Sequence, residues 1–194
     1  LDVDDRDHGV RMLLPSFAGF IGLHGVNDKR VGVCVNTMSQ LARRTQGMAS
    51  TFVIRTLLEK HSFDDAVEFV KSVPGTVGLN YIIAGRDELI DLEVSANQVV
   101  EVPAHPQRVF HTNHPLANED LHSPADEEQN RSIDVAGTTR ERLMVLEREL
   151  SNEAPFDVEH GKRLLSCRDA FVCRHHEDPI PAFTFTSAVM ELNN

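Results

Sequence analysis

The sequence lacks the features by which membrane, secreted and disulfide-stabilised proteins are recognised. No apolar run approaches the roughly 18–20 residues that a bilayer-spanning helix needs. The N-terminal stretch LDVDDRD has neither the basic nor the apolar region of a signal peptide. The three cysteines, Cys34, Cys167 and Cys173, show no C-x-x-C spacing and make an odd number of thiols. These absences predict a cytoplasmic, intracellular protein with no membrane partner.

Basic residues are also scarce, because 19 Lys and Arg face 30 Asp and Glu and give a net charge of −11. Binding to nucleic acid needs a basic surface that neutralises phosphates, so this balance argues against nucleic acid as the main partner. The motifs G-x-S-x-G, G-x-G-x-x-G and H-E-x-x-H and the Walker loop are all missing. We expect no cofactor and no resident metal ion.

What the sequence does contain is a hairpin signature between Phe17 and Met38. Two glycine-containing apolar runs flank a polar turn at residues 27–30. Alternation along the second run places Cys34 and Asn36 on one face of a strand. Cys34, inside an apolar strand and without an adjacent base, is typical of a buried, inert thiol. Asn36 must find hydrogen-bond partners there or face a pocket.

The rest of the chain alternates blocks of strands with blocks of helices. Strands gathered into meanders, with helices in separate blocks, indicate an α+β fold rather than a repeated βαβ winding. The polar stretch 115–136 has no period and is predicted to be a long surface loop. The predicted helices span 50–59, 62–73, 138–151 (with a capping box at its start) and 157–165. The predicted strands span 79–84, 89–94, 98–102, 108–113, 170–173 and 181–192.

Two groups of residues raise the question of metal binding. The acidic N-terminus lacks the glycine and the distal glutamate of a calcium loop, which favours a solvated acidic turn. His111 and His114 could join Cys173, His175 and His176 in a nitrogen/sulfur site. Positions three apart in a strand point to opposite faces, however, so turn-forming, hydrogen-bonding histidines are the commoner explanation.

Four motifs stand in the order of a known family: GFIGLHGVNDKRVGVCVNTM, GLNYIIAG, HTNHPL, and VCRHH followed by TFTSAVMEL. Together they resemble the isopenicillin N acyltransferase-like family of N-terminal nucleophile (Ntn) hydrolases, which is related to the choloylglycine hydrolases. The resemblance runs from Leu1 to about Leu192. It implies an αββα four-layer sandwich, incomplete at both ends, and a single Ntn-hydrolase-like domain over residues 1–194.

The resemblance also implies roles for polar residues at predicted strand ends. Asp2 matches the aspartate that orients the catalytic α-amine. Asn36 matches an asparagine that donates to the oxyanion, and Asn113 matches a second site asparagine. Arg174 matches the arginine placed near the nucleophile. Asn80 is a further polar residue at a strand end, for which the resemblance gives no role.

The family's nucleophile is a cysteine that becomes N-terminal by autoproteolysis, and this sequence has no counterpart of it. Leu1 has no nucleophilic atom, so we expect the cysteine in a precursor segment before Leu1. Cys34 is a strand cysteine also seen in the family and is not the nucleophile. Arg30 stands at a turn position where the family usually has glycine, a difference that bears on the turn type.

The leading expectation is an acyltransferase or amidohydrolase that acts on an amide bond through an N-terminal cysteine thioester. The alternatives are a catalytically inactive relative that binds an acyl or peptide ligand, and a metal-dependent protein that uses the histidines. The expected partners are a small-molecule amide or acyl substrate and the remaining segment of the precursor, with homo-oligomer formation open. A β-lactam, a bile-salt-like amide, an acyl-amino acid and a peptide all remain open as substrates.

Overall fold

The computed structural model describes residues 1–103, 108–122, 138–151, 156–178 and 183–192. Within them the chain forms a seven-stranded antiparallel sheet whose strands lie side by side in sequence order. The strands are β1 (Asp2–Asp5), β2 (Val10–Leu13), β3 (Gly25–Asn27), β4 (Gly32–Thr37), β5 (Leu79–Ala84), β6 (Leu89–Val94) and β7 (Val99–Glu101). The helices are α1 (Ser50–Leu57), α2 (Phe63–Ser72), α4 (Thr139–Leu150), α5 (Val158–Leu165) and a short 3-10 turn, η1 (Asp169–Phe171).

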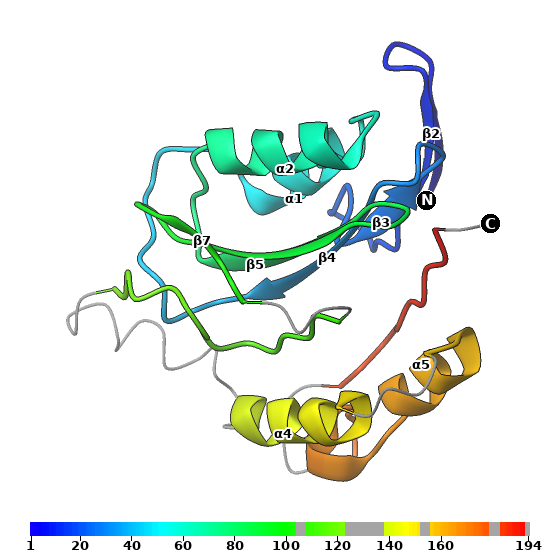
Figure 1. Cartoon of the computed structure of the whole chain (residues 1–194), viewed down its shortest axis with the longest axis vertical. Coiled ribbons are helices and arrows are strands. Elements are labelled where there is room, and N and C mark those ends of the chain that lie inside the picture. Colours follow the sequence, from blue (N-terminus) through cyan, green and yellow to red (C-terminus); the bar gives the residue numbers. More distant parts are fainter. Residues whose placement is uncertain (104–107, 123–137, 152–155, 179–182, 193–194) are drawn as a thin grey trace.

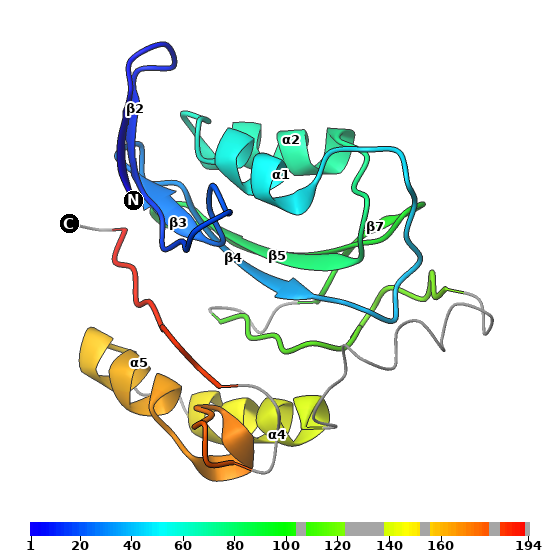
Figure 2. The ribbon, with the colours of Figure 1, turned by 180° about the vertical axis from the view of Figure 1, so that it is seen from behind.

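Helices α1 and α2 cover one face of the sheet, and α4 and α5 lie on its opposite side (Figure 1). The view from behind gives the same order of layers (Figure 2). We call the face of the sheet covered by α1 and α2 the helix face, and the opposite face the outer face. The helix face is apolar, because the alternating residues of β4, β5 and β6 that point to it are aliphatic or aromatic. Its buried residues include Val33, Tyr81, Ile83, Leu92 and Val94, which pack against Val53, Ile54, Leu57, Ala66 and Val70 of the helices.

The four predicted helices are confirmed, together with two of their caps. Ser62 accepts a hydrogen bond from the N–H of Asp65 at 3.1 Å and begins α2, and Asp157 begins α5 in the same way. The capping box at Thr138 is wrong, because its hydroxyl accepts a hydrogen bond from Arg174 at 3.1 Å instead of capping α4. None of the described helices is long and apolar enough to cross a membrane.

The meander predicted over residues 79–102 is also confirmed. Ala84 pairs with Leu89 across the β5–β6 hairpin, and the N–H of Gly85 donates to the carbonyl of Glu88 at 2.9 Å. β7 then pairs with β6 along the far edge of the sheet. This hairpin places the polar residues of β5 and β6 beside the end of β4.

The first hairpin is shorter than the sequence predicts. Its turn is real, but β3 spans only three residues, and residues 17–24 form bends rather than a strand. The N–H of Phe20 donates to the carbonyl of Phe17 at 3.0 Å, and Gly19 between them has φ +94°. That left-handed backbone, which glycine adopts without steric penalty, interrupts the extended conformation.

Asn27 ties this hairpin turn to the end of α1. Its Oδ1 accepts hydrogen bonds from the N–H groups of Lys29 and Val31 at 3.0 and 2.9 Å. Its Nδ2 donates to the carbonyls of Leu58 and Lys60, each at 2.8 Å. One buried amide therefore satisfies the turn and two carbonyls that the helix end leaves without intrahelical partners.

Two positions near this turn have a backbone geometry that disfavours most side chains. Arg30 has φ +65°, so the arginine adopts a left-handed conformation that glycine favours. Gly25 lies so close to β2 that a Cβ added to it would stand 2.5 Å from the carbonyl oxygen of Leu13. A side chain at Gly25 would therefore push β3 away from β2.

Three later strands that the sequence predicts are absent from the described residues. Residues 108–113 form a loop, and 170–173 contain η1, in which Ala170 and Phe171 have φ +47° and +60°. These left-handed residues interrupt an extended strand. Residues 183–192 form no ladder there either. Residues 123–136 of the predicted loop and the first two residues of the last predicted strand lie outside the described residues.

Candidate functional site

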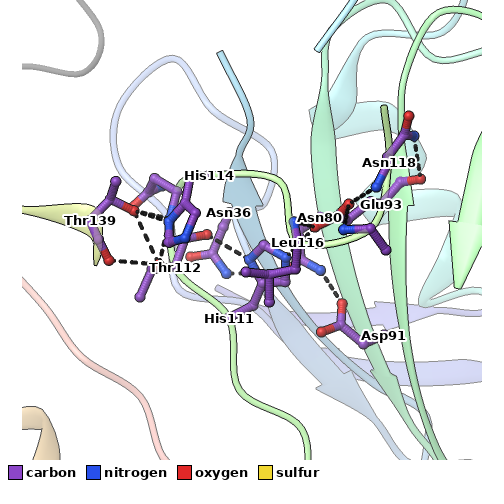
Figure 3. Close-up of polar contacts among 12 residues, drawn as sticks. Asn36, Asn80, Asp91, Glu93, His111, Thr112, His114, Leu116, Asn118 and Thr139 are labelled. Atoms are coloured by element: carbon purple, nitrogen blue, oxygen red, sulfur yellow. Dashed lines mark hydrogen bonds and ion pairs between the residues drawn. The ribbon is translucent and has the colours of Figure 1, made fainter. Parts of the chain in front are cut away.

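The outer face carries polar side chains where the helix face carries apolar ones. Asn36 of β4, Asn80 of β5 and Glu93 of β6 are register neighbours, and Asp91 shares their face. Asn80, Asp91 and Glu93 are each no more than 1% exposed. Because an unpaired buried polar group costs about 1–3 kcal/mol, these side chains must pair, and Figure 3 shows how they do so.

A chain of hydrogen bonds runs from Asn36 to Asp91. The Nδ2 of Asn36 donates to the Oδ1 of Asn80 at 3.1 Å, and the Nδ2 of Asn80 donates to a carboxylate oxygen of Asp91. An ionised carboxylate has no hydrogen to donate, so Asn80 must turn its NH2 group toward Asp91 and its oxygen toward Asn36. We call this the Asn36–Asn80–Asp91 chain.

Glu93 organises the loop that follows β7. Its carboxylate accepts from His111 Nε2 at 2.7 Å, and both side chains are fully buried. The same carboxylate accepts the backbone N–H groups of Leu116, Ala117 and Asn118 at 2.5, 3.0 and 2.6 Å. One carboxylate therefore satisfies four donors and fixes both ends of residues 111–118, the loop that carries Asn113.

Asp91 and Glu93 are both buried, but their pKa values shift in opposite directions. Burial raises the pKa of Asp91 to about 6, although the charge on His111 and the hydrogen bond from Asn80 lower it in part. Burial also opposes ionisation of Glu93, but its hydrogen bonds from His111 and three backbone N–H groups hold its pKa below the usual value. Burial disfavours the charged form of His111, yet the bond to Glu93 outweighs it and the pKa of His111 is raised.

Asn113 lies beside the end of β4. Its Nδ2 donates to the carbonyl of Thr37, the residue that follows Asn36, at 3.3 Å. Its Oδ1 accepts from Arg142 of α4 at 2.9 Å, and its backbone N–H donates to the hydroxyl of Thr139 at 2.8 Å. Asn113 therefore lies against the residue that follows Asn36 at the end of β4.

A buried hydroxyl and imidazole group supports Asn113 from behind. Thr139 Oγ1 lies 2.9 Å from His114 Nδ1 and 3.1 Å from Thr112 Oγ1, and Thr112 donates to the carbonyl of Thr139 at 2.9 Å. A hydroxyl beside a histidine can be an activated nucleophile. Here all three side chains are at most 5% exposed, so we read this group as structural. Burial lowers the pKa of His114, which keeps its ring neutral near pH 7.

Arg174 is linked to the asparagines indirectly, and Asp2 is not. Arg174 Nη2 donates to Thr138 at 3.1 Å, next to the Thr139 that holds Asn113. Asp2 lies on the edge strand β1, and β2 and β3 separate it from β4. It is exposed and binds Arg11 through bonds of 2.8 and 2.5 Å, which hold its pKa below the usual value.

Cys34 differs from its predicted state. It lies two residues before Asn36 on the outer face, and its side chain is exposed rather than buried. The outer face of β4 leaves this thiol exposed, whereas the apolar pattern of the strand predicted a buried one. Cys34 nevertheless has enough protein atoms around it for desolvation to raise the pKa of its thiol. A raised pKa leaves little thiolate and makes the group a poor nucleophile.

The histidine and cysteine metal site, the less favoured explanation of these residues, does not assemble in the described part of the chain. His111 turns to Glu93 and His114 to Thr139. Among the described residues, the group of donors close enough to share a metal is instead Asp5, His8 and Glu59. Arg55 already forms ion pairs with both carboxylates there, at 3.7 Å each, so a basic side chain accounts for the arrangement.

A pocket of about 640 Å³ lies away from the asparagines, between the end of α2 and the β6–β7 turn. Arg44, Lys71, Ser95 and Asn97 are among its lining residues. It contains no residue of the Asn36–Asn80–Asp91 chain. We therefore place the candidate site at the end of β4, where the polar side chains gather, and not in this pocket.

Comparison with known proteins identifies the family of this chain. The sequence model of a family described as acyl-coenzyme A:6-aminopenicillanic acid acyl-transferase matches residues 15–178. The chain belongs to this acyltransferase family. Asn36, Asn80, Asn113 and Arg174 lie within the part of the chain that matches the acyltransferase model, and Asp2 lies outside it.

A curated member of this acyltransferase family shares 33% identity with the chain over 115 residues. It is the 40 kDa form of acyl-coenzyme A:6-aminopenicillanic-acid-acyltransferase of Emericella nidulans. The aligned segment covers 58% of this chain and 31% of that protein. The chain thus spans about a third of the length of the acyltransferase that it matches.

Sequence reasoning missed the residues that support the asparagines. Asp91, Glu93 and Thr139 were not singled out, although they hold the site together. One signal was present, because LIDLEV places acids at alternating positions in an otherwise apolar strand. Such acids on a covered face indicate buried partners elsewhere in the chain.

Proposed function

We propose that this chain forms the oxyanion-binding core of an Ntn acyltransferase or amidohydrolase. The observation that carries the proposal is the hydrogen bond from Asn113 to the carbonyl of Thr37, the residue that follows Asn36 at the end of β4. Amide N–H groups held in place by other residues can stabilise the negative charge that develops during acyl transfer. Membership of the acyltransferase family supports this chemistry over a purely structural role.

In the proposed mechanism a cysteine, N-terminal after cleavage of a precursor and placed before Leu1, attacks the carbonyl carbon of an amide. The α-amine takes the thiol proton, and the carbonyl oxygen becomes an oxyanion that Asn36 and Asn113 bind. The C–N bond then breaks, the departing amine takes a proton, and a thioester remains. Water or an acceptor amine attacks the thioester and releases the acid or a new amide.

Asp2 and Arg174 take supporting roles in this proposal. Asp2 would orient the catalytic amine, which requires it to give up its exposed pair with Arg11 and the amine to lie between β1 and the asparagines, across β2 and β3. Arg174 would lie near the nucleophile, and its link through Thr138 to the start of α4 supports a place beside Asn113. The proposal also includes completion of the αββα sandwich of this single domain by a second sheet on the outer face.

For the substrate class we propose an acyl group carried as an amide or a thioester. The matched relative is named for transfer from acyl-coenzyme A to 6-aminopenicillanic acid, which is one such exchange.

The proposal is tested by expressing the gene with its upstream region. We expect mass spectrometry to find an N-terminal cysteine produced by cleavage, and a chromogenic amide substrate to be hydrolysed. Replacing that cysteine with alanine should abolish both results, whereas Cys34→Ala should leave both unchanged. A protein that is neither cleaved nor active would contradict the enzyme proposal.

A second candidate function is an inactive relative that binds an acyl or peptide ligand. The observation that favours it is Asp2, which is paired with Arg11 at the edge of the sheet rather than placed beside the asparagines. This candidate predicts that calorimetry with a non-hydrolysable acyl amide detects binding to the full protein without turnover. Turnover of the corresponding amide would exclude it.

A further inference from the structure

The Asn36–Asn80–Asp91 chain ends in a group that can change its hydrogen-bonding character. Asn80 is fully buried and Asp91 is 1% exposed, so neither can exchange its partner for bulk water. An amide in such a position has two orientations, which differ by a half-turn that swaps its oxygen and nitrogen. Whichever orientation its fixed neighbour permits will dominate.

When Asp91 is ionised, its carboxylate permits only one orientation of the Asn80 amide. Asp91 accepts from Asn80 Nδ2, so Asn80 Oδ1 faces β4 and Asn36 must bring its own Nδ2 to that oxygen at 3.1 Å. Two successive amides are thus aligned by one acceptor. The nitrogen of Asn36 carries a second N–H, and its direction is set as soon as the first is committed.

Protonation of Asp91 removes this constraint. A carboxylic acid can donate, so Asn80 could then accept from Asp91 and turn its NH2 group toward Asn36. The oxygen of Asn36 would then have to accept a hydrogen bond from the NH2 group of Asn80, and the nitrogen of Asn36 would point the opposite way. The charged groups that face Asp91 among the described residues are Glu93 on its own strand and His111 from the loop.

We propose that Asp91 is a positioning residue that sets, through Asn80, the direction in which Asn36 presents its N–H to the oxyanion. This inference rests on the proposed function of Asn36, but its structural part stands without any activity. Asp91 touches neither substrate nor reacting atoms in this scheme. It acts only through the orientation of two amides.

The structural part is tested by the side-chain amide signals of Asn36 and Asn80 in ¹⁵N-labelled protein between pH 4.5 and 7.5. Both signals should shift together, with a midpoint near 6, the value to which burial raises the pKa of Asp91. Asp91→Asn should abolish the shift. Asp120→Asn is the matched control and should preserve it, because Asp120 accepts from a different asparagine, Asn97.

Two results would overturn the inference. One is a constant Asn36 signal while that of Asn80 titrates, which would confine the effect of Asp91 to Asn80. The other is a titration that survives in Asp91→Asn, which would assign it to His111. If Asp91→Asn does not fold, Asn80→Ser replaces it, and the Asn36 signal should then be independent of pH.

The functional part uses the full, processed protein. Asp91→Asn should lower kcat about tenfold with KM unchanged, and Asp120→Asn should match the wild type. A normal kcat in Asp91→Asn, together with a large loss in Asn36→Ala, would overturn the positioning role alone. A normal kcat in Asn36→Ala would instead refute the proposed function, and the amide spectra would still decide the structural part.

Discussion

The two faces of β6 show how one six-residue strand serves both stability and the candidate site. Leu92 points to the helix face and is fully buried among apolar side chains. Asp91 and Glu93, on either side of it, point to the outer face and are equally buried. The helix face gains stability from packing, whereas the outer face depends on a complete set of hydrogen bonds and on pH.

The largest effect is expected from Glu93→Gln. It removes the charge that pairs with His111 and one acceptor needed by the loop N–H groups, so we expect a loss of about 4 kcal/mol in the free energy of unfolding at pH 7. Because the pKa of Glu93 is lowered on folding, its contribution is present above its ordinary pKa and is lost as the pH falls. Urea unfolding should therefore find a smaller loss at pH 4 than at pH 7.

Glu101→Gln on the neighbouring strand is the control for this change, because Glu101 is exposed and pairs with Leu92 only through the backbone. It should alter stability by less than about 0.5 kcal/mol. Equal effects of the two substitutions would remove the distinction between a buried and an exposed glutamate.

The next effect comes from the helix face. Leu92→Ala leaves a cavity among packed aliphatic residues and should reduce the free energy of unfolding by about 3 kcal/mol. The loss should be the same at pH 4 and pH 7, since no titratable group is involved. A pH-dependent loss would mean that the two faces are coupled rather than separate.

Asp91 supplies a smaller effect with the opposite sign to that of Glu93. Its pKa rises on folding, so ionised Asp91 opposes folding and its contribution to stability falls as the pH rises from about 4 to about 6. Between pH 4.5 and 7 this amounts to about 2 kcal/mol. Asp91→Asn should remove this pH dependence. Urea unfolding should therefore find that the stability of the variant relative to the wild type is higher at pH 7 than at pH 4.5.

The smallest effect lies outside both faces, at the first hairpin turn. Arg30→Gly relieves the left-handed backbone of a residue with a side chain and should stabilise the protein by about 1 kcal/mol. Thermal unfolding provides the measurement, with Lys29→Gly as the control, because Lys29 does not have a positive φ. A destabilised Arg30→Gly variant would show that the arginine side chain contributes more than its backbone strain costs.

Local patterns in the sequence predicted most of the framework. The four helices follow from apolar periodicity, and the β5–β6 hairpin follows from alternation around Gly85. Both depend on interactions between residues close in sequence. The strand predicted at 170–173 failed because Ala170 and Phe171 have positive φ, which their residue types do not favour and their sequence does not indicate.

The candidate site could be predicted only in part. The motif resemblance pointed to Asn36 and Asn113, and Asn113 donates to the carbonyl of Thr37, the residue after Asn36. The supports could not be found from local patterns, because Glu93 bonds to residues 18 to 25 positions away. Which buried acid meets which loop depends on the assembled sheet, and sequence spacing does not carry that information.

The central claim is that Asn36 and Asn113 together bind the oxyanion at the end of β4. The most direct measurement is kcat for the processed full protein carrying Asn36→Ala or Asn113→Ala, with Asn97→Ala as an exposed asparagine control. The account predicts a loss of about 10²–10³-fold in kcat for each site variant and no loss for the control. Site variants with kcat equal to that of Asn97→Ala would contradict it.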